Sequence, residues 1–65
     1  MRNRLNEEDI TRQQAQVLWD RAHRHQMRGE LADAILLYKR SITVYPTAEA
    51  YTFLGWCYNM IDLHE

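Results

Sequence analysis

The stretch AYTFLGWCY, residues 50–58, decides the fold of this chain of 65 residues. A helix drawn through it, at about 100° per residue, is apolar around most of its circumference. Such a helix normally lies between two others, whereas the residues before it supply cover for one flank and the sequence ends at Glu65. The apolar side chains fall into three groups: Ala50, Leu54, Cys57 and Ile61 in the middle, Tyr51 and Tyr58 on one flank, and Phe53, Trp56 and Met60 on the other.

A first helix is predicted from near Asn6 to Arg28. Asn6 can cap it, three acidic residues follow at the positive end of its dipole, and Gly29 favours a stop. Its apolar side chains are sparse, so we expect a half-buried helix with a solvated outer face. The residues expected on its buried side are Ile10, Val17, Leu18 and Ala22.

A second helix is predicted from about Glu30 to Val44. Leu37 and Val44 widen its apolar stripe, which indicates two neighbouring helices. Pro46 ends it, because the residue before a proline is pushed out of the α region, and Thr47 can cap a third helix. The stripe, at spacings of three and four, consists of Leu31, Ala34, Ile35, Tyr38, Ser41, Ile42 and Tyr45.

Length and composition narrow the class of protein. A chain this short forms one domain and buries only about 60% of its unfolded surface. Eight Lys and Arg against nine Asp and Glu give a formal net charge of −1, which provides no general attraction to nucleic acid or to anionic membranes. The single cysteine, Cys57, cannot form an internal disulfide, and no signal peptide or membrane span is recognisable. We therefore expect a cytoplasmic protein without membrane association.

Two motifs resemble the tetratricopeptide repeat (TPR) family. The string YTFLGWCY, residues 51–58, resembles the opening of that repeat, and Ala34, Tyr38 and Pro46 resemble its closing half. Ala22 and Gly55 stand in corresponding places 33 residues apart, close to the family period of about 34 residues. The resemblance implies structural roles for Ala22, Ala34, Tyr38, Pro46, Tyr51, Leu54, Gly55 and Tyr58.

The predicted fold is all-α, with three antiparallel helices that form a TPR-like helical hairpin plus the first helix of a second repeat. The expected parts are an N-terminal extension over 1–14, one repeat over 15–47 and a partial repeat over 48–65. Arg21 and His25 depart from the family, which usually has Leu and Tyr there. Their polarity implies either a terminal, solvent-facing helix or an ion pair that covers the site.

The resemblance implies a protein-interaction module. About three repeats are the usual stable minimum, and this chain has about one and a half, so we expect self-association, with a two-fold dimer favoured. The residues expected to mediate it are Phe53, Trp56, Cys57, Met60, Ile61 and Leu63. A peptide partner would lie in a groove lined by Gln16, Trp19, His23, Gln26, Thr52, Trp56 and Asn59.

Catalysis, cofactors and metal binding are not expected. His23 and His25 lie about 200° apart on a helix and are expected to face solvent, and Cys57 has no evident basic partner. One alternative is a structural or engineered self-assembly unit with no other ligand. A less favoured one is weak nucleic-acid binding through Arg21, Arg24 and Arg28.

Overall fold

The chain folds into three α-helices without any strand in the part that the structure describes. The computed structural model describes the backbone of residues 4–63 and the side chains of residues 7–62. The helices are α1 (Arg4–Met27), α2 (Leu31–Val44) and α3 (Ala48–Leu63). The predicted all-α fold with a helical hairpin is therefore confirmed.

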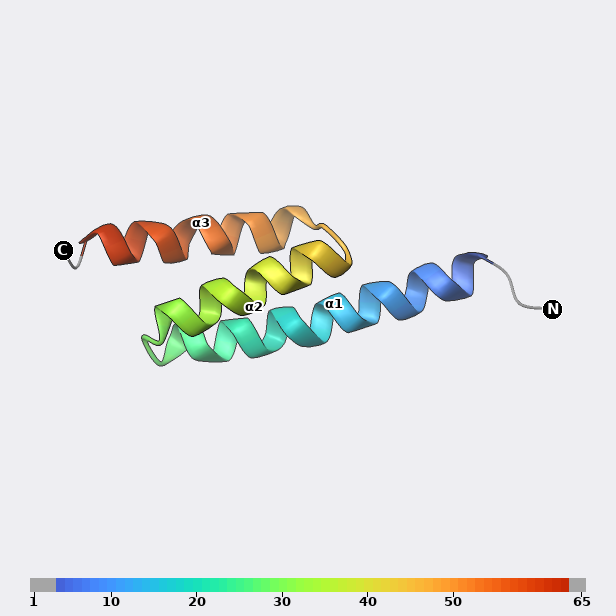
Figure 1. Cartoon of the computed structure of the whole chain (residues 1–65), viewed down its shortest axis with the longest axis horizontal. Coiled ribbons are helices and arrows are strands. Elements are labelled where there is room, and N and C mark those ends of the chain that lie inside the picture. Colours follow the sequence, from blue (N-terminus) through green and yellow to red (C-terminus); the bar gives the residue numbers. More distant parts are fainter. Residues whose placement is uncertain (1–3, 64–65) are drawn as a thin grey trace.

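The helices follow one another in antiparallel order along an elongated body. Figure 1 shows α2 between α1 and α3, with α1 and α3 running in the same direction. The molecule measures 54 × 17 × 13 Å along its principal axes. Because α1 has 24 residues and α2 only 14, the N-terminal part of α1 projects beyond the hairpin.

The turn between α1 and α2 is built on Gly29, as predicted. Its φ of +79° lies in the left-handed region, where glycine has no steric penalty. The N–H of Glu30 donates to the carbonyl of His25 (2.9 Å), and the N–H of Gly29 donates to that of Gln26 (3.0 Å). These two bonds satisfy the last carbonyls of α1 and form a Schellman motif.

The second turn matches its prediction as well. Thr47 caps α3 through a 3.1 Å hydrogen bond from the backbone N–H of Ala50 to its Oγ1. At the other side of the turn, Tyr45 leaves the helix with an extended backbone immediately before Pro46. Tyr45 also accepts a 3.0 Å hydrogen bond from the guanidinium of Arg12, which joins the end of α2 to α1.

Two details of α1 differ from the prediction. The helix begins at Arg4 rather than near Asn6, because Arg4 and Leu5 favour helix and nothing before Asn6 interrupts it. Ile10 and Val17 are each 56% exposed and do not face the core. The end of α2 reaches α1 only near Arg12 and Ala15, so α2 lies against a shorter and differently oriented face of α1 than the apolar spacing predicted.

The core lies where α2 meets both neighbours. Leu37 is buried as the two-neighbour prediction for α2 required, and Cys57 joins this core from α3. Ser41 donates a buried 2.8 Å hydrogen bond from its Oγ to the carbonyl of Ala15, which fixes α2 against α1. The fully or nearly fully buried apolar residues are Ala15, Ala22, Ala34, Leu37, Tyr38, Ala50 and Cys57.

Candidate interaction surface

An exposed aromatic surface lies on the side of α3 that points away from α2. Tyr51 is 57% exposed and Tyr58 is 44% exposed, and they flank Gly55 one helical turn away in either direction. A methyl group added to Gly55 would meet nothing within 4 Å. We call the exposed residues Tyr51, Thr52, Gly55, Tyr58 and Asn59 the α3 outer face.

Ala22 of α1 corresponds to Gly55 of α3, and its surroundings show how a helix can pack over a small residue at this position. Ala22 of α1 and Ala34 of α2 are both fully buried, because the two helices pass each other closely at these small residues. Gly55, which the sequence places 33 residues after Ala22, has no helix over it among the described residues. The sequence analysis predicted only a structural role for Gly55 and did not identify it as part of an exposed face. Gly55 lies on the opposite side of α3 from Ala50 and Cys57, which are buried. That relationship along the helix is the signal that could have identified this face as uncovered.

A second feature is a cluster of aromatic rings between α1 and α3. Trp19 and His23 stack with their ring centroids 5.0 Å apart and an interplanar angle of 7°. Phe53 meets Trp19 edge to face at 5.1 Å, and Trp56 lies 4.7 Å from Phe53. We call Trp19, His23, Phe53 and Trp56 the aromatic cluster. It brings three of the predicted groove residues together, and the stacking makes His23 half-buried rather than solvent-facing as predicted.

The other predicted groove residues have different surroundings. Gln26 is only 5% exposed, so it does not line a surface: its Oε1 accepts a 2.6 Å hydrogen bond from the Tyr38 hydroxyl. Gln16 is exposed and donates to the carboxylate of Asp20. Thr52 and Asn59 are exposed, and each lies about one helical turn from Trp56. Among the seven predicted groove residues, Gln26 is therefore the one that is buried.

The residues predicted for self-association divide in the same way. Trp56 and Met60 are 51% and 39% exposed and are available to a partner. Phe53 and Ile61 are half-buried, and Phe53 packs within its own chain. Cys57 is fully buried against α2 and is therefore a core residue, which corrects its assignment to an interface. The side chain of Leu63 lies outside the described residues.

The environment of Cys57 bears on its chemistry. Burial raises the pKa of the Cys57 thiol above its ordinary value. A buried thiol with a raised pKa holds its proton at neutral pH and is a poor nucleophile. Burial likewise raises the pKa of the Tyr38 hydroxyl, whose proton is held in the bond to Gln26.

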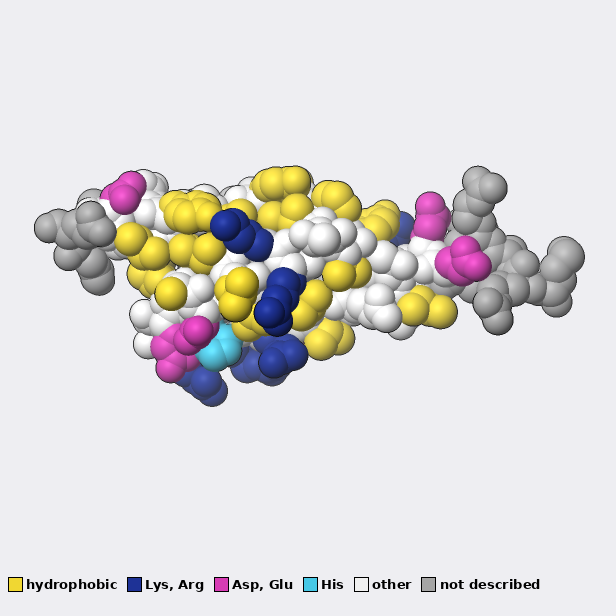
Figure 2. Space-filling model, viewed as in Figure 1, with side chains coloured by type: hydrophobic (Ala, Val, Ile, Leu, Met, Phe, Trp, Pro, Cys, Tyr) yellow, Lys and Arg dark blue, Asp and Glu magenta, His cyan; other side chains and the backbone are white. Residues whose placement is uncertain are grey.

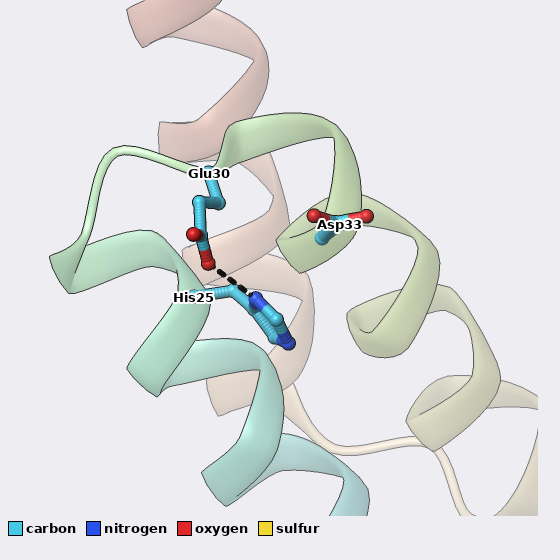
Figure 3. Close-up of side chains that lie close together, drawn as sticks. All are labelled: His25, Glu30 and Asp33. Atoms are coloured by element: carbon cyan, nitrogen blue, oxygen red, sulfur yellow. Dashed lines mark hydrogen bonds and ion pairs between the residues drawn. The ribbon is translucent and has the colours of Figure 1, made fainter.

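Three polar side chains gather at the α1–α2 turn. His25 Nδ1 lies 2.7 Å from Glu30 Oε1, and Figure 3 shows Asp33 nearby in the first turn of α2. The possible metal-binding atoms of the three residues lie within 4.8 Å of one another. Glu30 and Asp33 stand at the N-terminus of α2, where the helix dipole favours acids. That position accounts for both carboxylates without an ion, and three donors are fewer than the four of a structural zinc site.

Charge is unevenly divided among the helices. α3 carries the acids Glu49 and Asp62 and has no Lys or Arg. The basic residues of α1 that were considered for phosphate contact, Arg21, Arg24 and Arg28, are all exposed. Figure 2 shows hydrophobic side chains gathered along α3.

No helix among the described residues is both long enough and apolar enough to cross a membrane. Comparison of the chain with protein-family models, with curated proteins and with solved structures found no match. The resemblance to the TPR family is thus a prediction that depends on the motif residues themselves.

Proposed function

We propose that this protein is a non-catalytic interaction module of TPR type that completes the apolar surface of α3 by associating with further copies of itself. The observation that carries the proposal is the distribution of exposed large hydrophobic side chains. Eight such residues occur among those described, and four of them lie on α3. These four are Tyr51, Trp56, Tyr58 and Met60.

The single chain exposes more surface than a compact fold of its size. A compact monomer of 7.9 kDa is expected to expose about 4,400 Å². This chain exposes 4938 Å². Each apolar side chain left in water forgoes about 1.5–3 kcal/mol of burial, and a domain of this size has a total stability of only about 5 kcal/mol. Covering α3 would therefore add a large fraction of the stability available to the chain.

The alternative chemistry has less support. Cys57 is buried with a raised pKa, and the histidines are used in packing and in the turn, His23 against Trp19 and His25 beside Glu30. The exposed arginines of α1 belong to a chain with a formal net charge of −1, so nucleic-acid contact would be weak and salt-sensitive.

The test compares acidic substitutions at equally exposed apolar positions. Tyr51→Asp and Trp56→Asp lie on opposite flanks of α3, and at least one of them is expected to shift the protein toward the monomer in sedimentation equilibrium, because a charge in a desolvated interface is costly. Leu36→Asp on α2 is the matched control, since Leu36 is 50% exposed and Trp56 is 51% exposed. Phe53 is unsuitable here because it packs within its own chain. If neither substitution on α3 has a larger effect than Leu36→Asp, α3 is not the interface.

A further inference from the structure

We infer that the α3 outer face pairs with the same face of a second copy, with the two α3 helices antiparallel and crossing at Gly55 about a two-fold axis. This inference rests on the proposed self-association and specifies its geometry. It assigns the contact to the Tyr51–Gly55–Tyr58 side of α3 and leaves the aromatic cluster outside it.

The first support is Gly55 itself. Glycine in the interior of a helix is destabilising relative to alanine. Within the single chain nothing requires it: Gly55 is exposed, its φ is not positive, and a methyl group there would touch nothing within 4 Å. Helix axes usually pack about 8–10 Å apart. The absent side chain of Gly55 leaves room for the backbone of another helix to approach more closely than that.

The second support is that the face is complementary to itself. The two-fold axis lies between the two antiparallel helices and is perpendicular to both. Rotation about it does not exchange the left and right flanks, so the Tyr51–Tyr58 flank of one copy faces the same flank of the second copy. Residues on the same flank that lie about one turn from Gly55 in opposite directions, such as Tyr51 four residues before it and Tyr58 three after it, then lie opposite each other. Tyr51 of one copy would meet Tyr58 of the second copy, and Tyr58 would meet its Tyr51. Aromatic pairs of this kind stabilise interfaces beyond the area that they bury.

The polar flank matches in the same register. Thr52 of one copy would lie near Asn59 of the second copy, and the hydroxyl and amide can hydrogen-bond each other. The polar residues thus border the aromatic contacts, as polar residues form the rim of ordinary interfaces. Their hydrogen-bonding groups keep partners when water is excluded.

The third support is the placement of charge. Asp62 follows Gly55 by two turns and lies on the same side of α3 as Ala48, the first residue of the helix. In the antiparallel pair, the Asp62 carboxylate of one copy would approach the α3 N-terminus of the second. The positive end of that helix dipole favours a carboxylate. The other acid of α3, Glu49, lies roughly 120° around the helix from Gly55, so it stands to the side of this contact.

The experiment uses a substitution that the isolated chain tolerates. A Cβ at the exposed Gly55 meets no atom within 4 Å, and Gly55→Leu improves helix propensity, so the chain is expected to keep its fold. It would fill the crossing point, and we expect self-association to weaken by at least about tenfold in sedimentation equilibrium. Ala32→Leu adds a side chain of the same size at an exposed position of α2 and is the matched control, expected to leave association unchanged.

A cross-linking measurement tests the register independently of any effect of Gly55→Leu on folding. Gly55→Cys places two thiols at the two-fold axis, within the roughly 4.4–6.8 Å between Cα atoms that a disulfide requires. Mild oxidation is expected to give a covalent dimer on a non-reducing gel. Thr43→Cys, exposed on α2, is expected to give none, and the native Cys57 stays reduced because it is buried.

The outcomes separate the inference from the function on which it rests. If Gly55→Leu and Gly55→Cys behave like their α2 controls while Trp56→Asp dissociates the protein, the crossing at Gly55 is wrong and self-association through another side of α3 stands. If the unsubstituted chain is monomeric throughout, self-association itself is wrong. A covalent Gly55→Cys dimer together with loss of association in Gly55→Leu would establish the pairing.

Discussion

The hydroxyl of Tyr38 donates a 2.6 Å hydrogen bond to Gln26 Oε1, and both side chains are buried between the helices. The residues are 12 positions apart and belong to α2 and α1. The amide of Gln26 continues toward α3, where its Nε2 lies 3.9 Å from Met60 Sδ. This pair links all three helices through a polar contact inside an apolar core.

Loss of that hydrogen bond is expected to destabilise the fold. Tyr38→Phe keeps the ring but leaves Gln26 Oε1 buried without its donor, which costs about 1–3 kcal/mol in the free energy of unfolding. Urea unfolding followed by circular dichroism measures it. The control is Tyr45→Phe, which removes a hydroxyl bonded to exposed Arg12 and should cost less than about 0.5 kcal/mol. Equal losses in the two variants would contradict the buried pair.

Ser41 provides a second internal test, of the contact between α2 and α1. Ser41→Ala removes the buried hydrogen bond to the Ala15 carbonyl and is expected to lower the free energy of unfolding by about 0.5–1.5 kcal/mol. Thr43→Ala, at an exposed hydroxyl that bonds within α2, should change it by less than about 0.5 kcal/mol. A larger effect at Thr43 than at Ser41 would mean that α2 presents a different face to α1.

The turn at Gly29 should resist substitution by residues with a side chain. Gly29→Ala forces a β-carbon into a left-handed backbone conformation and is expected to cost about 1–2 kcal/mol. Gly29→Asn should cost less, because asparagine tolerates that conformation. Thermal unfolding of the two variants checks the order. If alanine proves as stable as asparagine there, the Schellman turn is not the native one.

Stability should fall at alkaline pH. Burial raises the pKa of Cys57 above its ordinary 9.0 and that of Tyr38 above its ordinary 10.0, so the folded chain keeps protons that the unfolded chain releases. Their contribution is fully present below about pH 9 and is lost as the pH rises through and beyond these ordinary values. Urea unfolding from neutral pH upward should show the decline, with a shallower slope in Tyr38→Phe. A flat profile would show that neither group is buried in its protonated form.

The sequence was sufficient to predict the features that depend on local chemistry. Gly29 marked the first turn, Pro46 and Thr47 marked the second, and the spacing along α2 identified a helix with two neighbours. Each of these follows from backbone preferences or from the helical period within a few residues.

The wrong predictions concern contacts between distant parts of the chain. Val17 was placed on the buried side because apolar residues were counted along α1 alone, whereas the shorter α2 selects which face is covered. Gln26 was expected at a surface, since nothing local shows that Tyr38 bonds to it. His23 is covered by Trp19 from its own helix and by Phe53 from α3, which no spacing within α1 could indicate.

The central claim, that α3 carries a surface built to be covered by another copy, is tested most directly by sedimentation equilibrium of the unsubstituted chain between about 1 and about 100 µM. Self-association predicts a mass that rises with concentration toward twice the 7.9 kDa of the chain. It also predicts helicity that increases together with the mass. A constant 7.9 kDa species with full, concentration-independent helicity across that range would contradict the claim.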